Sequence, residues 1–235
     1  MISILSVETA AGVASAAVTV GEKLVCEAVV NNKKTHSQTL LPIIDKVLAQ
    51  AEMRLEDIDV IAVSEGPGSF TGLRIGISTV KGLAHALSKP VIGVSSLVAM
   101  AYNLSFCEYI ISPIMDARRS QVYNAVYEWK NRELEEIKAP RAISVEELCS
   151  ELSALDKKTV FVGDGVPAYR DVIEELLGDK AVFAPSCANM QRASALAPAA
   201  ARLFDEGKTM TCYELKPVYL RKSQAEREAE EKNNI

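Results

Sequence analysis

The sequence predicts an α/β protein built as two similar lobes, each with the order β-β-β-α-β-α-β. Three observations lead to this fold class. Nearly half of the 235 residues are hydrophobic, so the chain can bury a sizeable core. Short strand-like runs alternate with longer stretches of helical periodicity. The same order of elements occurs twice, although no repeat is visible in the sequence itself.

The first half of the chain predicts three strands, then a helix, a strand, a helix and a strand. The first three strands form an antiparallel meander, with Gly21-Glu22 at one turn. The first helix has an apolar stripe, and Pro42 marks either its true start or a kink in it. The predicted strands are residues 3–10, 14–20, 23–30, 59–64 and 90–95, and the helices are residues 36–51 and 70–88.

The second half repeats this order. Its meander turns at Asn131-Arg132, and Ser144 caps the helix that follows, with Glu147 at the capping-box spacing. Pro167 opens the next helix and Gly178 closes it. The predicted strands are residues 109–117, 121–129, 133–143, 159–165 and 181–185, and the helices are residues 144–152, 167–178 and 194–207.

Two copies of this order are typical of the actin, hexokinase and Hsp70 superfamily, the duplicated actin-like (ASKHA, ribonuclease H-like) fold. We expect the boundary between the lobes near residues 103–108. The prediction therefore assigns residues 1–103 to an N-terminal lobe and residues 104–235 to a C-terminal lobe. Residues 221–235 are too charged for a core and are expected to be a solvated helix or a disordered end.

Composition narrows the classes of function. A formal net charge of −5 argues against this chain alone being the main docking surface for nucleic acid. The five cysteines are scattered and form no C-x-x-C pair, which indicates reduced thiols rather than a zinc knuckle or a disulfide framework. No apolar run is as long as a membrane span, and the N-terminus lacks the pattern of a signal peptide. We expect a cytoplasmic protein without a membrane partner.

The stretch AVSEGPGSFTGLRIGISTVKGLAHAL, residues 62–87, has the strand–loop–helix form of a phosphate-binding corner. However, the stretch matches none of the known sequence patterns of phosphate-binding loops. No Lys-Ser/Thr pair closes a Walker loop, and Thr71 stands where the dinucleotide fingerprint needs its last glycine. Ser69 lies between Gly68 and Phe70, so the stretch is not a nucleophile elbow either.

The helix after this loop has a stripe of small residues, including Gly72, Gly76, Thr79 and Ala86. Glycine inside a helix costs about 0.5–1 kcal/mol relative to alanine, so two on one stripe indicate close approach of another backbone. That backbone belongs either to the chain's own sheet or to another subunit. The second interpretation predicts an interface formed by the two helices of the first lobe, through His36, Leu40, Leu41, Ile44, Leu48, Phe70, Gly72, Leu73, Gly76, Thr79 and Leu83.

The same stretch, SEGPGSFTGLRIGISTVKGLA, closely resembles the signature of the TsaB family. HSQTLLPIIDKVL, SPIMDARRSQVYNAVY and KPVYLRKSQAE resemble other parts of that family, so the likeness covers almost the whole chain. The resemblance implies a subunit of the bacterial machinery that makes threonylcarbamoyladenosine in tRNA, at the adenosine beside the anticodon (position 37) of tRNAs that read codons beginning with A. It also implies a homodimer that pairs with the catalytic paralogue TsaD through the first two helices and is joined by the ATPase TsaE.

The resemblance further implies that this chain does not itself catalyse. The catalytic relative has an H-x-x-x-H metal motif, a spacing that lets both imidazoles project from one helix face. Here His36 is followed by Leu40, and His85 is the other histidine of the chain. We therefore predict no metal site and expect His36 to be a polar residue at a helix start.

Sequence features of the superfamily's nucleotide site are missing here as well. Glu8-Thr9-Ala10 follows the first strand without the glycine that allows close approach of a phosphate. Gly163-Asp164-Gly165 stands where the superfamily often has a Gly-Gly pair, and we interpret it as a tight strand-to-helix turn with Asp164 near the helix N-terminus. We predict no bound cofactor, while a weak site for ATP or ADP that is completed at an interface stays open.

Three arginines are further candidates for contact with a partner or with tRNA: Arg74, Arg118 and Arg119. The tRNA is expected to bind only through the complex. Two alternatives remain: a small-molecule kinase or ATPase of the superfamily, with Glu8 essential, and a glycoprotease-like peptidase. A peptidase would need either metal ligands or a nucleophile with a base. No second histidine stands at the spacing of a metal site, and Ser69 has no identifiable histidine partner.

Overall fold

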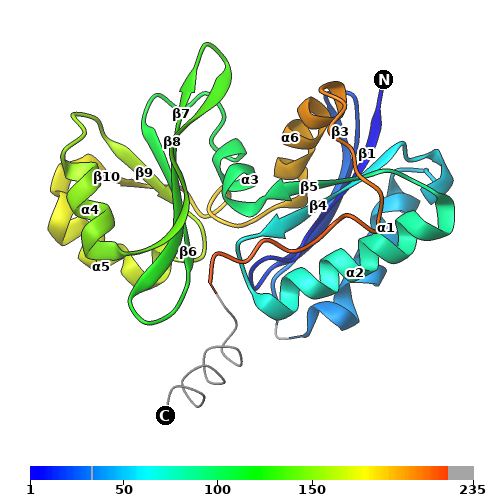
Figure 1. Cartoon of the computed structure of the whole chain (residues 1–235), viewed down its shortest axis with the longest axis horizontal. Helices are drawn as coiled ribbons and strands as arrows, with labels where there is room; N and C mark the ends of the chain where they lie inside the picture. Colours follow the sequence, from blue (N-terminus) through cyan, green and yellow to red (C-terminus); the bar gives the residue numbers. More distant parts are fainter. Residues whose placement is uncertain (33, 222–235) are drawn as a thin grey trace.

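The computed structural model describes residues 1–32 and 34–221. These residues form two lobes side by side, each built on one mixed five-stranded sheet (Figure 1). The predicted order of elements is confirmed in both lobes. The prediction for the charged tail falls, from residue 222 on, outside the described residues.

The first sheet has the strand order β3-β2-β1-β4-β5. The antiparallel meander β1–β3 is joined to parallel β4 and β5 through the pairing of β1 with β4. Helix α1 begins six residues before Pro42, which therefore lies inside it. The elements of this lobe are β1 (Ser3–Glu8), β2 (Ala14–Val20), β3 (Lys23–Val30), α1 (His36–Gln50), the 3-10 turn η1 (Leu55–Asp57), β4 (Val60–Gly66), α2 (Phe70–Leu87), β5 (Val91–Ser95) and α3 (Ser96–Tyr102).

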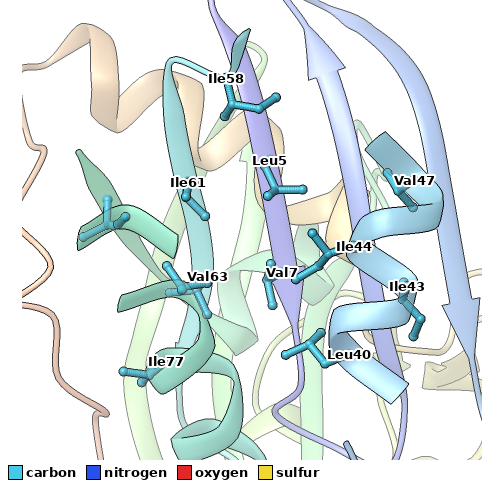
Figure 2. Close-up of a cluster of buried hydrophobic side chains, with 14 of the residues drawn as sticks. Leu5, Val7, Leu40, Ile43, Ile44, Val47, Ile58, Ile61, Val63 and Ile77 are labelled. Carbon is cyan, nitrogen blue, oxygen red and sulfur yellow. The ribbon is translucent and has the colours of Figure 1, made fainter. Parts of the chain in front are cut away.

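Helices α1 and α2 cover one face of the first sheet. Side chains that alternate along the parallel strands β1 and β4 point to this face and meet the apolar stripe of α1 (Figure 2). Leu5 and Val7 of β1 lie beside Ile44 in this cluster, and all three are buried. The apolar stripe of residues 36–51 is thus used for the lobe's own core.

The second sheet has the strand order β10-β9-β6-β7-β8, and a turn with positive φ at Asn131 and Arg132 joins its two longest strands. Ser144 Oγ accepts the Glu147 amide at 3.1 Å, as the predicted N-cap requires. The elements are β6 (Ile110–Asp116), β7 (Gln121–Lys130), β8 (Glu133–Ser144), α4 (Val145–Ser153), β9 (Thr159–Val162), α5 (Val166–Leu177), η2 (Gly178–Lys180) and β10 (Ala181–Phe183).

The end of the chain does not follow the predicted division at residue 103. Helix α6 (Ala193–Asp205) returns to the first lobe, where Leu196 and Ala200 pack against β1, β4 and β5 (Figure 1). The C-terminal segment, residues 209–221, continues along the same lobe and pairs Met210 with Val91. The second face of the first sheet needs an apolar cover, and α6 supplies it together with α3. Cys212 and Leu215 of the C-terminal segment pack instead in the cluster on the α1–α2 face.

Candidate functional site

Glu8 closes β1 and is fully buried. Its Oε1 accepts hydrogen bonds from the Ala10 amide at 2.6 Å and from Ser64 Oγ at 2.8 Å. Its Oε2 has no partner among the described residues. Burial raises the pKa of this carboxyl to about 7, and the two hydrogen bonds offset only part of that effect. A carboxyl enclosed in this way does not touch a ligand bound at the surface.

The glycine loop, residues 66–69, packs on the turn that follows β1. The Ser69 amide donates to Ala10 O at 2.7 Å, and a Cβ at Gly68 would overlap that same carbonyl. Ser69 Oγ accepts the Gly72 amide at 3.2 Å and so caps α2. The amides of Ser69 and Gly72 are therefore used inside the chain and are not available to a phosphate.

Gly72 and Gly76 also face the chain itself. Thr9 Oγ1 donates to Gly72 O at 2.9 Å, and a Cβ at Gly76 would overlap Thr9 Oγ1. A Cβ at Gly72 would overlap Thr9 O. The prediction that these two glycines admit a second subunit is therefore wrong, because the backbone that approaches them is the Thr9 turn of the same chain.

The other predicted interface residues divide into two groups. Four of them are buried in the first lobe and cannot form an outer surface: Leu40, Ile44, Leu48 and Leu73. The rest are at least partly open: Leu41, which is 49% exposed, and the half-buried His36, Phe70, Thr79 and Leu83. The helix pair thus keeps an outer face, but a smaller one than the sequence suggested.

His36 holds the start of α1 to the turn after β1. Its Nε2 lies 2.7 Å from Ala11 O, and a carbonyl only accepts, so Nε2 carries the proton and donates. This contact matches the expectation of a polar residue at a helix start. It also occupies Nε2, which leaves Nδ1 as the ring nitrogen with a lone pair.

A second small-residue stripe on α2 was missed in the sequence. It faces solvent and consists of Thr71, Ser78, Gly82 and Ala86. Gly82 has nothing within 4 Å of the place where a Cβ would stand. The spacing of three and four residues was the available signal. Spacing alone does not tell which of two small faces is covered by the chain's own sheet.

The second lobe contributes Asp164 to the junction between the lobes. Gln191 Nε2 donates to Asp164 Oδ1 at 2.8 Å, and desolvation by the surrounding protein raises the pKa of this carboxyl. The charge of Asp164 also raises the pKa of Glu8, and that of Asp116 raises the pKa of Asp164. The structure therefore brings the predicted residues Glu8 and Asp164 close enough for their charges to interact.

Gly163 and Gly165 shape the strand-to-helix turn around Asp164. Gly163 has a φ of +119°, and a Cβ there would overlap Ile114 O. The Gly163 amide donates to Asn189 Oδ1 at 3.0 Å, and the Gly165 amide donates to Ile114 O at 3.1 Å. These amides are used in the turn, as the interpretation of a tight turn requires, and α5 begins directly after it.

The C-terminal segment connects the three candidate arginines, a role that the sequence did not reveal. Tyr219 stacks on Phe70 with ring centroids 4.7 Å apart, and Arg74 Nε donates to the Tyr219 hydroxyl at 3.1 Å. Two residues later, Arg221 donates to Ala117 O at 3.0 Å. Arg118 and Arg119 follow Ala117 directly and are exposed. Phe70, a predicted interface residue, is thus partly covered by its own chain.

Two general properties of the described residues bear on function. No group of three or more His, Cys, Asp and Glu side chains in residues 1–32 and 34–221 is arranged to hold a metal ion. Over the same residues, every helix is too short or too polar to pass through a lipid bilayer.

Comparison with known families places the chain among tRNA-modification proteins. The family model described as "TsaD: tRNA N6-adenosine threonylcarbamoyltransferase" matches residues 23–229. The protein named "tRNA threonylcarbamoyladenosine biosynthesis protein TsaB" of Bacillus subtilis is 33% identical over 224 residues, which are 95% of this chain and 96% of that protein. The Escherichia coli protein of the same name is 34% identical over 82% of this chain and 83% of its own length.

Solved structures agree with this placement. A Pseudomonas aeruginosa structure described as an uncharacterized protein with similarity to peptidase YEAZ matches with a TM-score of 0.81 at 27% identity, over 94% of this chain and 100% of that chain. The ethanolamine utilization protein EutJ of Carboxydothermus hydrogenoformans matches with a TM-score of 0.52 at 12% identity, over 82% and 88% of the two chains. The second likeness concerns the fold alone, and the predicted duplicated actin-like fold is confirmed.

Proposed function

The chain belongs to the TsaB family and takes part in the modification of tRNA to threonylcarbamoyladenosine, and on this premise we propose that it is a non-catalytic assembly subunit. It pairs with a catalytic TsaD-like paralogue, and a TsaE-like ATPase joins the pair. The complex transfers a threonylcarbamoyl group to the adenosine at position 37 of tRNAs that read codons beginning with A. Without its partner the chain forms a homodimer, and we expect it in the cytoplasm.

The use of the site residues inside the chain supports a role without catalysis. Glu8 is enclosed, the Ser69 amide donates to Ala10 O, and the Gly72 amide donates to Ser69 Oγ at the start of α2. An actin-like kinase or ATPase needs donors and a metal-binding carboxylate that reach the nucleotide phosphates. Release of phosphate from ATP by the isolated chain would favour that alternative over the assembly role.

One observation carries the assembly role: the outer face of α1 and α2 is open and carries both an exposed leucine and a stripe of small residues. Leu41 is 49% exposed on α1, and α2 presents the stripe that includes Ser78 and Gly82. Small residues let a second helix come close, and an exposed leucine beside them gains from being covered. An actin-like partner of similar shape offers such a helix pair.

The test is a substitution on this face with a matched control on the other lobe. Leu41→Asp places a charge at the centre of the proposed contact, where a buried unpaired carboxylate weakens binding at least tenfold. Leu176→Asp is the control, because Leu176 is 48% exposed on α5 and lies outside the face. Titration calorimetry with the purified paralogue measures both affinities. Equal affinities for the two variants and the wild type would contradict the proposal.

A further inference from the structure

Four arginines from three separate segments lie close together on one side of the molecule. We call Arg74, Arg118, Arg119 and Arg221 the arginine cluster. The C-terminal segment brings them together, because Tyr219 accepts from Arg74 Nε and Arg221 donates to Ala117 O, next to Arg118. In Figure 1 this segment runs alongside α2, and Arg221 near its end reaches the turn between β6 and β7. Nothing in the linear spacing of these residues predicts the cluster.

Among the residues that the structure describes, no carboxylate forms a salt bridge with the arginine cluster. The arginines that do form salt bridges within residues 1–32 and 34–221 are Arg54, Arg141, Arg170, Arg192 and Arg202, and none of them belongs to the cluster. Asp116 lies next to the cluster in the chain, and its Oδ1 accepts the backbone amide of Arg118 at 2.8 Å rather than its side chain. Asp116 also accepts from the Tyr169 hydroxyl at 3.2 Å. The net charge of the chain is −5, so this positive region stands out locally.

The turn between β6 and β7 holds two of the arginines in an unusual backbone. Arg118, Arg119 and Ser120 have φ values of +65°, +57° and +55°, a left-handed run that L residues rarely adopt. All three residues are exposed, so burial of their side chains does not account for the conformation. The hydrogen bond from the Arg118 amide to Asp116 and the one from the Gln121 amide to Arg118 O hold the turn in place.

From this arrangement we infer that the arginine cluster is a docking surface for the phosphodiester backbone of the tRNA that the complex modifies. The inference rests on the proposed function, since it concerns the assembled complex. Guanidinium groups bind phosphate through two parallel hydrogen bonds, and they keep their charge at any physiological pH. Four arginines are a small footprint for a polyanion. The cluster therefore adds affinity to binding by the complex and does not hold tRNA alone.

The experiment measures tRNA binding by the purified complex with its catalytic partner, at several salt concentrations. Arg118→Glu together with Arg119→Glu changes the two arginines whose side chains make no hydrogen bond or salt bridge within the described residues. Loss of two phosphate contacts lowers the slope of log Kd against log salt by about 1.8, at about 0.9 per contact on duplex RNA or DNA. Binding at low salt weakens at least tenfold, and in the modification assay the KM for tRNA rises while kcat is unchanged.

Arg132→Glu is the matched control. Arg132 is exposed and has a φ of +68°, so the substitution meets the same backbone strain and the same change of charge per replaced residue. It lies at the other end of β7, which is about 30 Å from Arg119 at about 3.3 Å per residue. The control complex should bind tRNA as the wild type does.

Four outcomes separate the possibilities. Weaker binding and a lower salt slope in the double variant alone support the inference. Unchanged binding by an intact double-variant complex overturns it and leaves the proposed function standing. If the double variant loses its catalytic partner in size-exclusion chromatography, the cluster contacts protein rather than RNA, and the inference is overturned. If the wild-type chain forms no complex, the proposed function fails and the inference fails with it.

Discussion

Thr9 occupies the space that Gly76 leaves open on α2. The Thr9 hydroxyl donates to Gly72 O at 2.9 Å and lies where a Cβ of Gly76 would stand. Thr9 is fully buried, so the contact ties the end of β1 to the first two turns of α2 without water between them. Any side chain at position 76 must displace this hydroxyl.

Gly76→Ala should therefore destabilise the monomer. The added methyl group overlaps Thr9 Oγ1 and breaks its bond to Gly72 O, at a cost of about 2–4 kcal/mol from overpacking and the lost hydrogen bond. Gly82→Ala is the matched control, because no atom stands within 4 Å of its Cβ position. That change should raise the free energy of unfolding by about 0.5–1 kcal/mol. Urea denaturation measures both values, and equal effects would contradict the packing described here.

Gly82→Leu should leave the monomer folded and weaken pairing. Its side chain points into open space in the monomer but blocks the close approach of a partner helix to the outer stripe of α2. We expect the Kd for the catalytic paralogue to rise at least tenfold, measured by titration calorimetry. An unchanged Kd with a folded monomer would place the interface elsewhere.

Glu8 should make stability depend on pH. Its pKa is about 7 in the folded protein against an ordinary 4.5, so the folded state keeps the proton to higher pH than the unfolded chain does. Folding takes up a proton between these values, and the free energy of unfolding falls as the pH rises through that window, by about 3 kcal/mol in total. Below pH 4.5 Glu8 is protonated in both the folded and the unfolded state, so it no longer makes the free energy of unfolding depend on pH.

Glu8→Gln removes this dependence, because an amide does not ionise and its oxygen can still accept from Ala10 and Ser64. The difference between the free energies of unfolding at pH 5 and pH 8 should shrink by about 2–3 kcal/mol. Glu133→Gln, an exposed carboxylate at the start of β8, serves as the control. A variant with the same pH profile as the wild type would show that Glu8 is solvated.

Tyr219→Ala should loosen the C-terminal segment. The change removes the stack on Phe70 and the bond from Arg74, which are worth about 1 kcal/mol together. The Val218 amide, which donates to Glu65 O at 2.7 Å, should then exchange its hydrogen about fivefold faster. Tyr213→Ala, at the His85 end of the segment, should leave that rate unchanged. Equal exchange in both variants would mean that Tyr219 does not anchor the segment.

Much of the fold could be predicted because its signals are local. The order of strands and helices follows from hydrophobic periodicity, and the cap at Ser144 and the turn at Asn131-Arg132 follow from residues that are neighbours in the chain. The place of α6 could not be predicted in this way. The apolar periodicity of this helix does not tell which sheet it covers. It packs on the first sheet because one face of that sheet would otherwise be uncovered.

The candidate site shows the same division. The sequence shows directly that α2 contains Gly72 and Gly76 and that a carboxylate precedes Thr9. It also shows the likeness to a family. Which of the two small faces of α2 the chain covers, and that Arg221 lies beside Arg118, were decided by tertiary packing. Periodicity records which residues share a face, since it arises from backbone geometry within one element. What lies against that face depends on the competition of all elements for buried surface, and no local stretch contains that information.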